Sequence, residues 1–208
     1  MAEFELFAGL DVYQYFEIKE ECLIHEIDDL TAAELAGRTV ATWQADLLAK
    51  YRIEPVRFYP YDAQFTCEEA MVAPISLADW VPDVDPHKDD PPEPGYLVMA
   101  TFPFSGDEVM LYVRPSEFAY KPYLATSVTA PTTDQLGTIT IKREFQIGRV
   151  APDQVEWEAD RLVTELGYHF FKLFKISAHD TQQYNASLPA LIEEEMIKRL
   201  SKPSTNEP

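Results

Sequence analysis

The chain has 208 residues, of which 46% are hydrophobic and 12% aromatic, so it can bury a sizeable core and is not disordered along its whole length. Seventeen basic residues against 36 acidic residues give a formal net charge of −19. Because a surface this acidic repels a phosphate backbone, we expect no direct binding of nucleic acid by this chain alone.

Apolar residues at helical spacing predict a first helix over residues 3–30. Thr31 and Glu34 have the spacing of a capping box and predict the start of a second helix that runs to about Tyr51. The step Glu54-Pro55 ends this helix, because the residue before a proline avoids the helical conformation. We expect an extended segment over residues 56–62.

The central part of the sequence predicts a β-sheet core. We expect a strand at 71–80 and a proline-rich acidic surface loop at 82–94, and the apolar run at 96–104 is typical of a strand covered on both faces. Ser105-Gly106-Asp107 predicts a turn, with residues 109–113 as the returning strand of a hairpin. Further strands are expected at 123–129 and 137–145, and residues 96–150 are charge-neutral.

The C-terminal part is expected to be helical from Pro152 onward. Asn185 or Ser187 can cap a second helix, with Pro189 in its first turn. The sequence therefore predicts an α+β fold with N-terminal helices, a central antiparallel β-sheet or sandwich and a C-terminal helical hairpin. Residues 1–150 hold the helical start and the β core, residues 151–208 hold the last helices and a frayed tail, and we expect one compact unit.

Cys22 and Cys67 are the two cysteines, and their spacing indicates neither a disulfide framework nor a zinc site. We expect both to be free, buried thiols in a reducing compartment. The N-terminal segment lacks a basic n-region, and no apolar run is long enough to span a bilayer. These features predict a cytoplasmic protein without membrane contact.

The usual signatures of catalysis are missing from the sequence. Its seven glycines form no GxGxxG, GxxxxGK[ST] or GxSxG motif, so we assign no catalytic residue, no metal ligand and no cofactor. One alternative is a metal- or small-ligand-dependent enzyme, in which His25, Asp28 and Asp29 would share a helix face as ligands. Such a cluster on an acidic helix is more often a solvated face.

Arg114 is the most informative basic residue of the charge-neutral region. It belongs to a basic group whose other members are Lys121, Lys142, Arg143 and Arg149. Arginine suits bidentate pairing with a carboxylate of a partner, although salt bridges to the acidic helices are the commoner role. Because aromatic and arginine side chains concentrate binding energy, the residues we expect to contact a partner are Arg114, Phe118, Tyr120, Tyr123, Tyr184 and Asn185. Core packing is the alternative for the aromatic ones.

Four short motifs together resemble the N-terminal region of a family of poorly characterised bacterial proteins. The motifs are Lys50-Tyr51-x-x-Glu54-Pro55, Pro103-Phe104-x-Gly106-Asp107, Arg114-Pro115-Ser116-x-Phe118 and Asp180-x-x-x-Tyr184-Asn185-x-Ser187-Leu188. Longer members of this family carry a restriction-endonuclease-like domain after the shared region, whereas this sequence ends at Pro208 without one.

The resemblance implies a role in bacterial defence against phage or other foreign DNA. We therefore expect a non-catalytic adaptor or sensor subunit that binds a protein partner, such as an effector or nuclease subunit, and that can form oligomers. A further alternative is an acidic nucleic-acid mimic that inhibits a DNA-binding protein, which would need its carboxylates gathered on one face.

Overall fold

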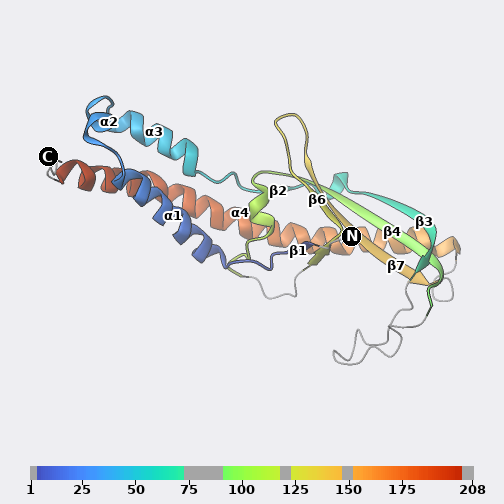
Figure 1. The fold of residues 1–208 in the computed structure, drawn as a ribbon. Coiled ribbons are helices and arrows are strands. Elements are labelled where there is room, and N and C mark those ends of the chain that lie inside the picture. The colour runs from blue at the N-terminus through green and yellow to red at the C-terminus, as the bar shows by residue number, and fades with distance from the viewer. Residues whose placement is uncertain (1–3, 73–90, 118–122, 147–151, 203–208) are drawn as a thin grey trace.

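The computed structural model describes residues 4–72, 91–117, 123–146 and 152–202. Antiparallel strands and helices lie in separate parts of the chain, which confirms the predicted α+β class. A single long helix, α4 (Val155–Ser201), passes behind the sheet and continues beside the N-terminal helices (Figure 1). The chain is therefore organised along this helix, with a sheet half and a helical half.

The main sheet is built around strand β4 (Glu93–Ser105). One edge of β4 pairs with β2 (Arg57–Phe58) and β3 (Gln64–Val72), and its other edge pairs with β7 (Gly137–Gln146). Strand β6 (Ser127–Thr129) then pairs with β7, and all of these pairings are antiparallel. The alternation predicted for residues 137–145 is confirmed, since Ile139 and Ile141 are buried on one face of β7.

Helix α4 covers one face of this sheet. Alternate residues of β4 point toward it, and Phe102 meets Phe170 edge to face at 5.5 Å between ring centroids. Phe58 of β2 stacks on Phe174 at 4.9 Å. The intervening residues of β4, such as Leu97 and Met99, are half-buried, so the apolar run at 96–104 is fully covered on one face and not on both as we expected.

The helical half forms because α4 extends beyond the sheet. Helix α1 (Val12–Asp28) runs parallel to this part of α4, as shown by Phe16 stacked on Tyr184 and by Arg199 donating to the carbonyl of Leu30. Helix α3 (Val40–Tyr51) packs on the same stretch of α4. The short helix α2 (Ala32–Ala36) precedes α3 in the sequence, and its predicted capping box between Thr31 and Glu34 is present. The single helix expected from Thr31 to about Tyr51 is wrong, because α2 ends at Ala36 and Thr39 caps the separate helix α3.

The predicted helical hairpin at the C-terminus is wrong, because α4 is continuous through Pro189. A proline ring fixes φ at a helical value, but it removes one hydrogen bond, here to the carbonyl of Asn185, and its ring crowds that same carbonyl. The buried stripe of α4 continues on both sides of this point, at Leu188 and Ile192. Burial of that stripe against α1 and α3 outweighs the lost bond, and Gln44 of α3 donates to the Pro189 carbonyl at 3.2 Å.

The predicted helix over 3–30 begins later than expected. Residues Phe4–Leu6 form strand β1, which pairs with β5 (Tyr123–Ala125), and Asp11 then caps α1 by accepting from the amide of Tyr13. The helical spacing at Phe4 and Phe7 therefore did not distinguish a strand and turn from a first helical turn. Pairing with a segment more than one hundred residues away decided the conformation.

The predicted hairpin at residues 105–113 is also wrong. The turn exists, with Gly106 at φ +97°, but residues Glu108–Leu111 form a 3-10 helix capped by Asp107. The turn is held from outside, because the amide of Asp107 donates to the carbonyl of Glu54. A Cβ atom at Gly106 would lie 2.5 Å from the carbonyl oxygen of Pro55, so only glycine fits this approach. Both edges of β4 are already paired, one with β2 and β3 and the other with β7, so no edge is left for a returning strand.

Gly167 offers a stability prediction in the middle of α4. A Cβ atom there would lie 3.6 Å from Cβ of Pro60 and 3.9 Å from Phe102, which is ordinary van der Waals contact. Gly167→Ala should therefore raise the free energy of unfolding by about 0.5–1 kcal/mol, because alanine has the higher helix propensity and causes no clash. Urea unfolding measures this. Gly167→Leu should destabilise the protein, and equal gains for both variants would show that Pro60 does not pack here.

Asn185 offers a second prediction, because it connects α4 to the end of α3. Its side-chain amide donates to the carbonyl of Ile53 at 2.7 Å and accepts from the amide of Ile53 at 3.0 Å. Asn185→Ala leaves both buried backbone groups of Ile53 without these partners and should lower the free energy of unfolding by about 2–3 kcal/mol. The matched control is Gln182→Ala at an exposed position of α4. Equal stability of the two variants in urea would disprove this role of Asn185.

Candidate protein-interaction surface

The residues that we expected to contact a partner are mostly engaged within the fold. Tyr184 is 4% exposed and stacks on Phe16, and the side chain of Asn185 donates a hydrogen bond to the backbone carbonyl of Ile53. Tyr123 is half-buried on the core and meets Phe170 edge to face at 5.1 Å. Phe118 and Tyr120 lie outside the described residues. Core packing, the alternative for these aromatic residues, is what the structure shows for Tyr123 and Tyr184.

Arg114 lies beside the start of α1. Its backbone accepts from the amide of Val12 and donates to the carbonyl of Leu10, and its side chain is 4.0 Å from the carboxylate of Asp11. About half of that side chain is exposed, at 48%, so contact between Arg114 and a partner stays a prediction.

The predicted basic group around Arg114 is divided among separate contacts. Lys142 of β7 pairs with Glu144 at 2.8 Å, whereas Arg114 is beside Asp11. Arg143 lies opposite Val98 in the sheet. Lys121 and Arg149 lie outside the described residues. Among the described members, the structure therefore gives Arg114 and Lys142 different carboxylate neighbours instead of one shared anion site.

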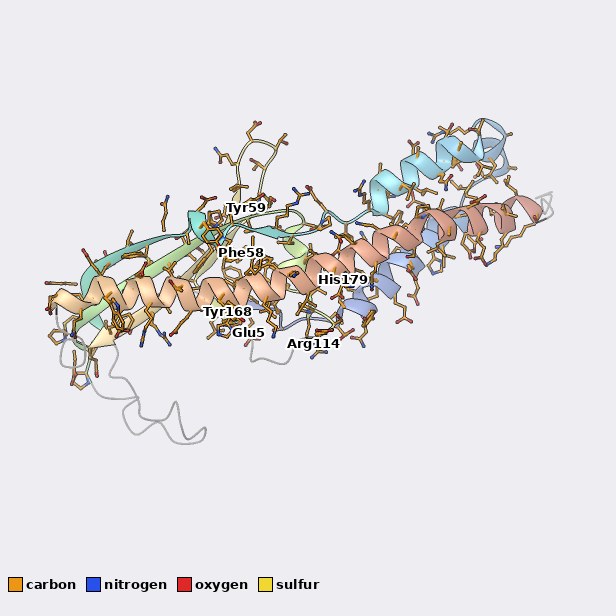
Figure 2. All side chains as sticks on the ribbon, turned by 180° about the vertical axis from the view of Figure 1, so that it is seen from behind. Glu5, Phe58, Tyr59, Arg114, Tyr168 and His179 are labelled. Atoms are coloured by element: carbon orange, nitrogen blue, oxygen red, sulfur yellow. The ribbon has the colours of Figure 1, made fainter. Side chains whose placement is uncertain are left out.

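The surface that sequence reasoning missed is a group of exposed aromatic side chains on the outer side of α4. We call it the aromatic face, and it consists of Tyr61, Trp157, Tyr168 and Phe171. Their exposed fractions are 100%, 61%, 70% and 51%, whereas the neighbouring Phe170 is fully buried. Figure 2 views the molecule from the side of α4, with Tyr168 labelled on the helix in front of the sheet.

A shallow groove runs along this face between α4 and the 3-10 helix Pro60–Asp62. Its volume is about 410 Å³, and Tyr61, Tyr168 and Phe171 line it together with Asp160. Pro60 packs over Gly167 of the helix, where a Cβ atom on residue 167 would lie 3.6 Å from Cβ of Pro60. The aromatic side chains therefore border a groove formed by two elements that are far apart in the sequence.

No protein-family model, no curated protein and no solved structure matches this chain.

A second groove lies between α1 and α4 and has an acidic lining. Glu17 and Glu20 face it, and burial together with the charge of Glu17 raises the pKa of Glu20 above its ordinary value. The buried hydroxyl of Tyr184 has no hydrogen-bond partner, and burial and the charge of Glu20 raise its pKa as well. The groove holds about 350 Å³ and contains no basic residue.

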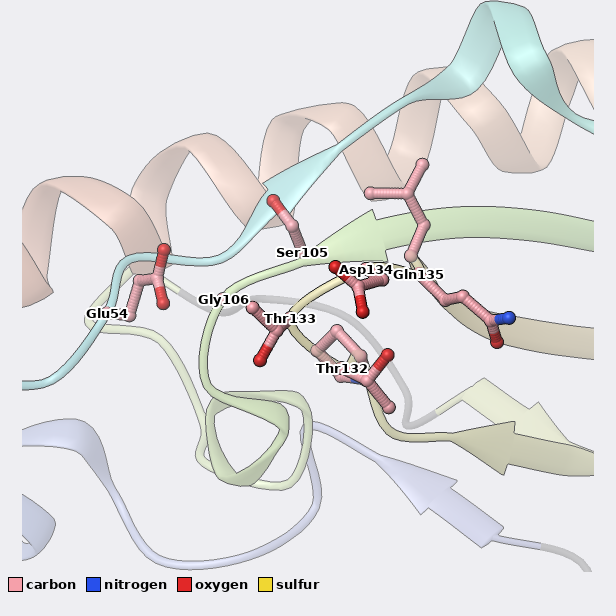
Figure 3. A pocket seen from close by; sticks show the side chains of 9 residues that line it. Glu54, Ser105, Gly106, Thr132, Thr133, Asp134 and Gln135 are labelled. Carbon is pink, nitrogen blue, oxygen red and sulfur yellow. The ribbon is translucent and has the colours of Figure 1, made fainter.

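A third pocket lies at the edge of the sheet, between Glu54, the Ser105-Gly106 turn and the loop from Pro131 to Leu136 (Figure 3). Its volume is about 780 Å³, and its side chains are mainly hydroxyl, carboxylate and amide groups. No histidine, cysteine, lysine or arginine is among its lining residues.

The metal site of the enzyme alternative does not form among the described residues, where no three His, Cys, Asp or Glu side chains are grouped to hold an ion. Asp28 instead pairs with Lys202 at 2.5 Å, which lowers the pKa of its carboxyl group. Both cysteines are exposed, so the expected burial of Cys22 and Cys67 is wrong. None of the helices in the described part of the chain combines the length and apolar character needed to cross a bilayer.

The aromatic face generates a prediction that separates surface from core. The double substitution Tyr168→Gln and Phe171→Gln should change the free energy of unfolding by less than about 0.5 kcal/mol per site at low protein concentration, because both side chains are exposed. The matched substitution Phe170→Ala should cost about 3–5 kcal/mol. Urea unfolding of the three proteins checks this, and a loss in the double variant as large as that in Phe170→Ala would place Tyr168 and Phe171 in the core.

Proposed function

We propose that this chain is a non-catalytic protein-binding subunit that acts through the aromatic face. The observation that carries the proposal is the exposure of Tyr61, Trp157, Tyr168 and Phe171 on one side of the molecule. Tyrosine and tryptophan are enriched among the residues that dominate binding energy at protein interfaces. Contiguous exposed apolar side chains mark interaction sites in soluble proteins.

Helix α4 itself supplies an internal comparison. Its exposed residues between His179 and Glu194 are polar or small, as expected for a helix face in water, with Gln182, Gln183 and Glu193 as examples. Over the sheet, the exposed residues of α4 include the large aromatic side chains of Trp157, Tyr168 and Phe171 beside charged ones. The outer face of α4 is therefore polar between residues 179 and 194 and partly aromatic over the sheet. The aromatic part is suited to contact with another protein.

The aromatic face also suits binding because it is already ordered. Three of its four side chains project from a helix that is fixed on its inner side by Leu162, Phe170 and Phe174. Tyrosine and tryptophan lose little conformational entropy on binding, and a rigid helix removes most of the backbone cost. The resemblance to proteins that carry a nuclease domain adds the expectation that the complex serves defence against foreign DNA.

The proposal predicts that a photo-crosslinking amino acid at position 168, in the cell that makes the protein, will form a covalent adduct with a protein. The control places the same amino acid at Thr133, an exposed residue of the loop between β6 and β7. Adducts from position 168 and not from position 133, identified by mass spectrometry, support the proposal whether the captured chain is another protein or a second copy. Absence of any adduct from position 168 would contradict it.

A further inference from the structure

The aromatic face belongs to a longer stripe of α4 whose members are spaced by four and three residues. The stripe consists of Trp157, Arg161, Thr164, Tyr168, Phe171 and Lys175, and all six are exposed. Since an α-helix rises 1.5 Å per residue, the stripe is about 27 Å long. It lies opposite the buried stripe that includes Leu162, Phe170 and Leu173, so it follows the outer side of the helix.

The two ends of this stripe carry opposite charges. Around Trp157 the helix and the turn before it carry acids and no base, namely Asp153, Glu156, Glu158 and Asp160. From Tyr168 to Lys175 the helix carries Lys172 and Lys175 and no acid. The outer face of α4 over the sheet is therefore acidic at its start and basic at its end.

We propose that the aromatic face binds a second copy of this chain, with the two α4 helices antiparallel and related by a two-fold axis at the level of Leu166. This inference rests on the proposed function and names its partner. In a two-fold interface the same patch meets itself, so the patch must be self-complementary. The opposite charges at the two ends meet each other only when the helices are antiparallel, because a parallel pair would place acid against acid.

The antiparallel register also matches the aromatic residues with cations. Trp157 of one copy lies opposite Lys175 of the other, and Arg161 lies opposite Phe171. A cation over an aromatic ring is stabilised by the charge distribution of the ring. Within one copy, the guanidinium of Arg161 is already 5.4 Å from the ring centroid of Trp157, so this pairing of side chains occurs on the same face.

The net charge of −19 would at first sight oppose self-association. Residues 153–175 carry five acids and three bases, so this segment contributes little to that excess. Because the remaining repulsion between copies is screened by salt, the dimer should be weaker at low ionic strength than at physiological ionic strength. The opposite dependence would be expected for a contact held only by ion pairs.

Sedimentation equilibrium of the full chain at several concentrations tests the proposal. We expect a monomer–dimer equilibrium for the natural sequence. Lys172→Glu and Asp160→Lys should each weaken dimerisation about tenfold or more, since these two exposed positions lie at the same level in this register and each change places like charges there. A mixture of these two variants should associate. In the mixed dimer, one contact between positions 160 and 172 keeps its native aspartate and lysine, and the other contact pairs the introduced lysine with the introduced glutamate. The control Arg52→Glu reverses an exposed charge at the end of α3 and should leave the dimer unchanged.

Circular dichroism of each variant establishes that it is folded before its mass is compared. A monomer at every concentration and salt would overturn the self-association. So would a dimer that survives the double substitution Tyr168→Gln and Phe171→Gln, or two weakened variants that stay apart when mixed. A monomer whose position 168 crosslinks a different protein in the cell would overturn this inference and leave the proposed function standing, whereas a monomer without any adduct would remove both.

Discussion

Helix α4 has to be covered on its inner side along its whole length, and the rest of the molecule is arranged by that requirement. With 47 residues it is about 70 Å long, which is more than one small sheet or one short helix can cover. The sheet covers its first half through Phe58 and Phe102, and helices α1 and α3 cover its second half. The two halves share α4 as part of their packing. Phe174 of this helix stacks on Phe58 in the sheet half, and Tyr184 of the same helix stacks on Phe16 in the helical half.

Two polar side chains of α4, each of which makes two hydrogen bonds, help to join the halves. Asp180 of α4 accepts from both the amide and the hydroxyl of Ser116, at 3.0 and 2.8 Å. Asn185, little more than one turn later, binds the amide and carbonyl of Ile53. Each of these side chains makes hydrogen bonds to two polar groups in an irregular segment, where no strand or helix supplies partners. Polar backbone groups outside regular structure can be buried only when they have such hydrogen-bond partners. Asp180 and Asn185 belong to one of the four short motifs of the sequence, and the structure gives both a role in folding.

Local patterns of the sequence predicted part of the local structure, although the turn at Gly106 and the apolar spacing at Phe4 and Phe7 led to a wrong hairpin and a wrong helix start. The alternation in β7, the capping box at Thr31 and the periodicity of α4 up to Ser177 are all present, because each depends on residues close together in the chain. The pairing of β4 with β7 and of β1 with β5 was not predictable, since it depends on segments far apart in sequence. The same reason explains why the aromatic face was missed. Trp157, Tyr168 and Phe171 could have been found as the side of α4 opposite its buried stripe, but Tyr61 joins them only through the tertiary packing of Pro60 on Gly167.

Because α4 carries both the core and the aromatic face, binding of a partner to this helix would also affect the stability of the fold. Its inner side carries the core of both halves, and its outer side carries the aromatic face, so a partner on the outer side holds the helix that the core needs. A partner that binds the folded chain and not the unfolded chain stabilises the fold by mass action, in proportion to the logarithm of its concentration relative to its dissociation constant. For a second copy as partner, the stabilising ligand is the chain itself. The free energy of unfolding then rises with the concentration of the protein, which makes the thermal midpoint of unfolding a second, independent measure of the contact made by α4.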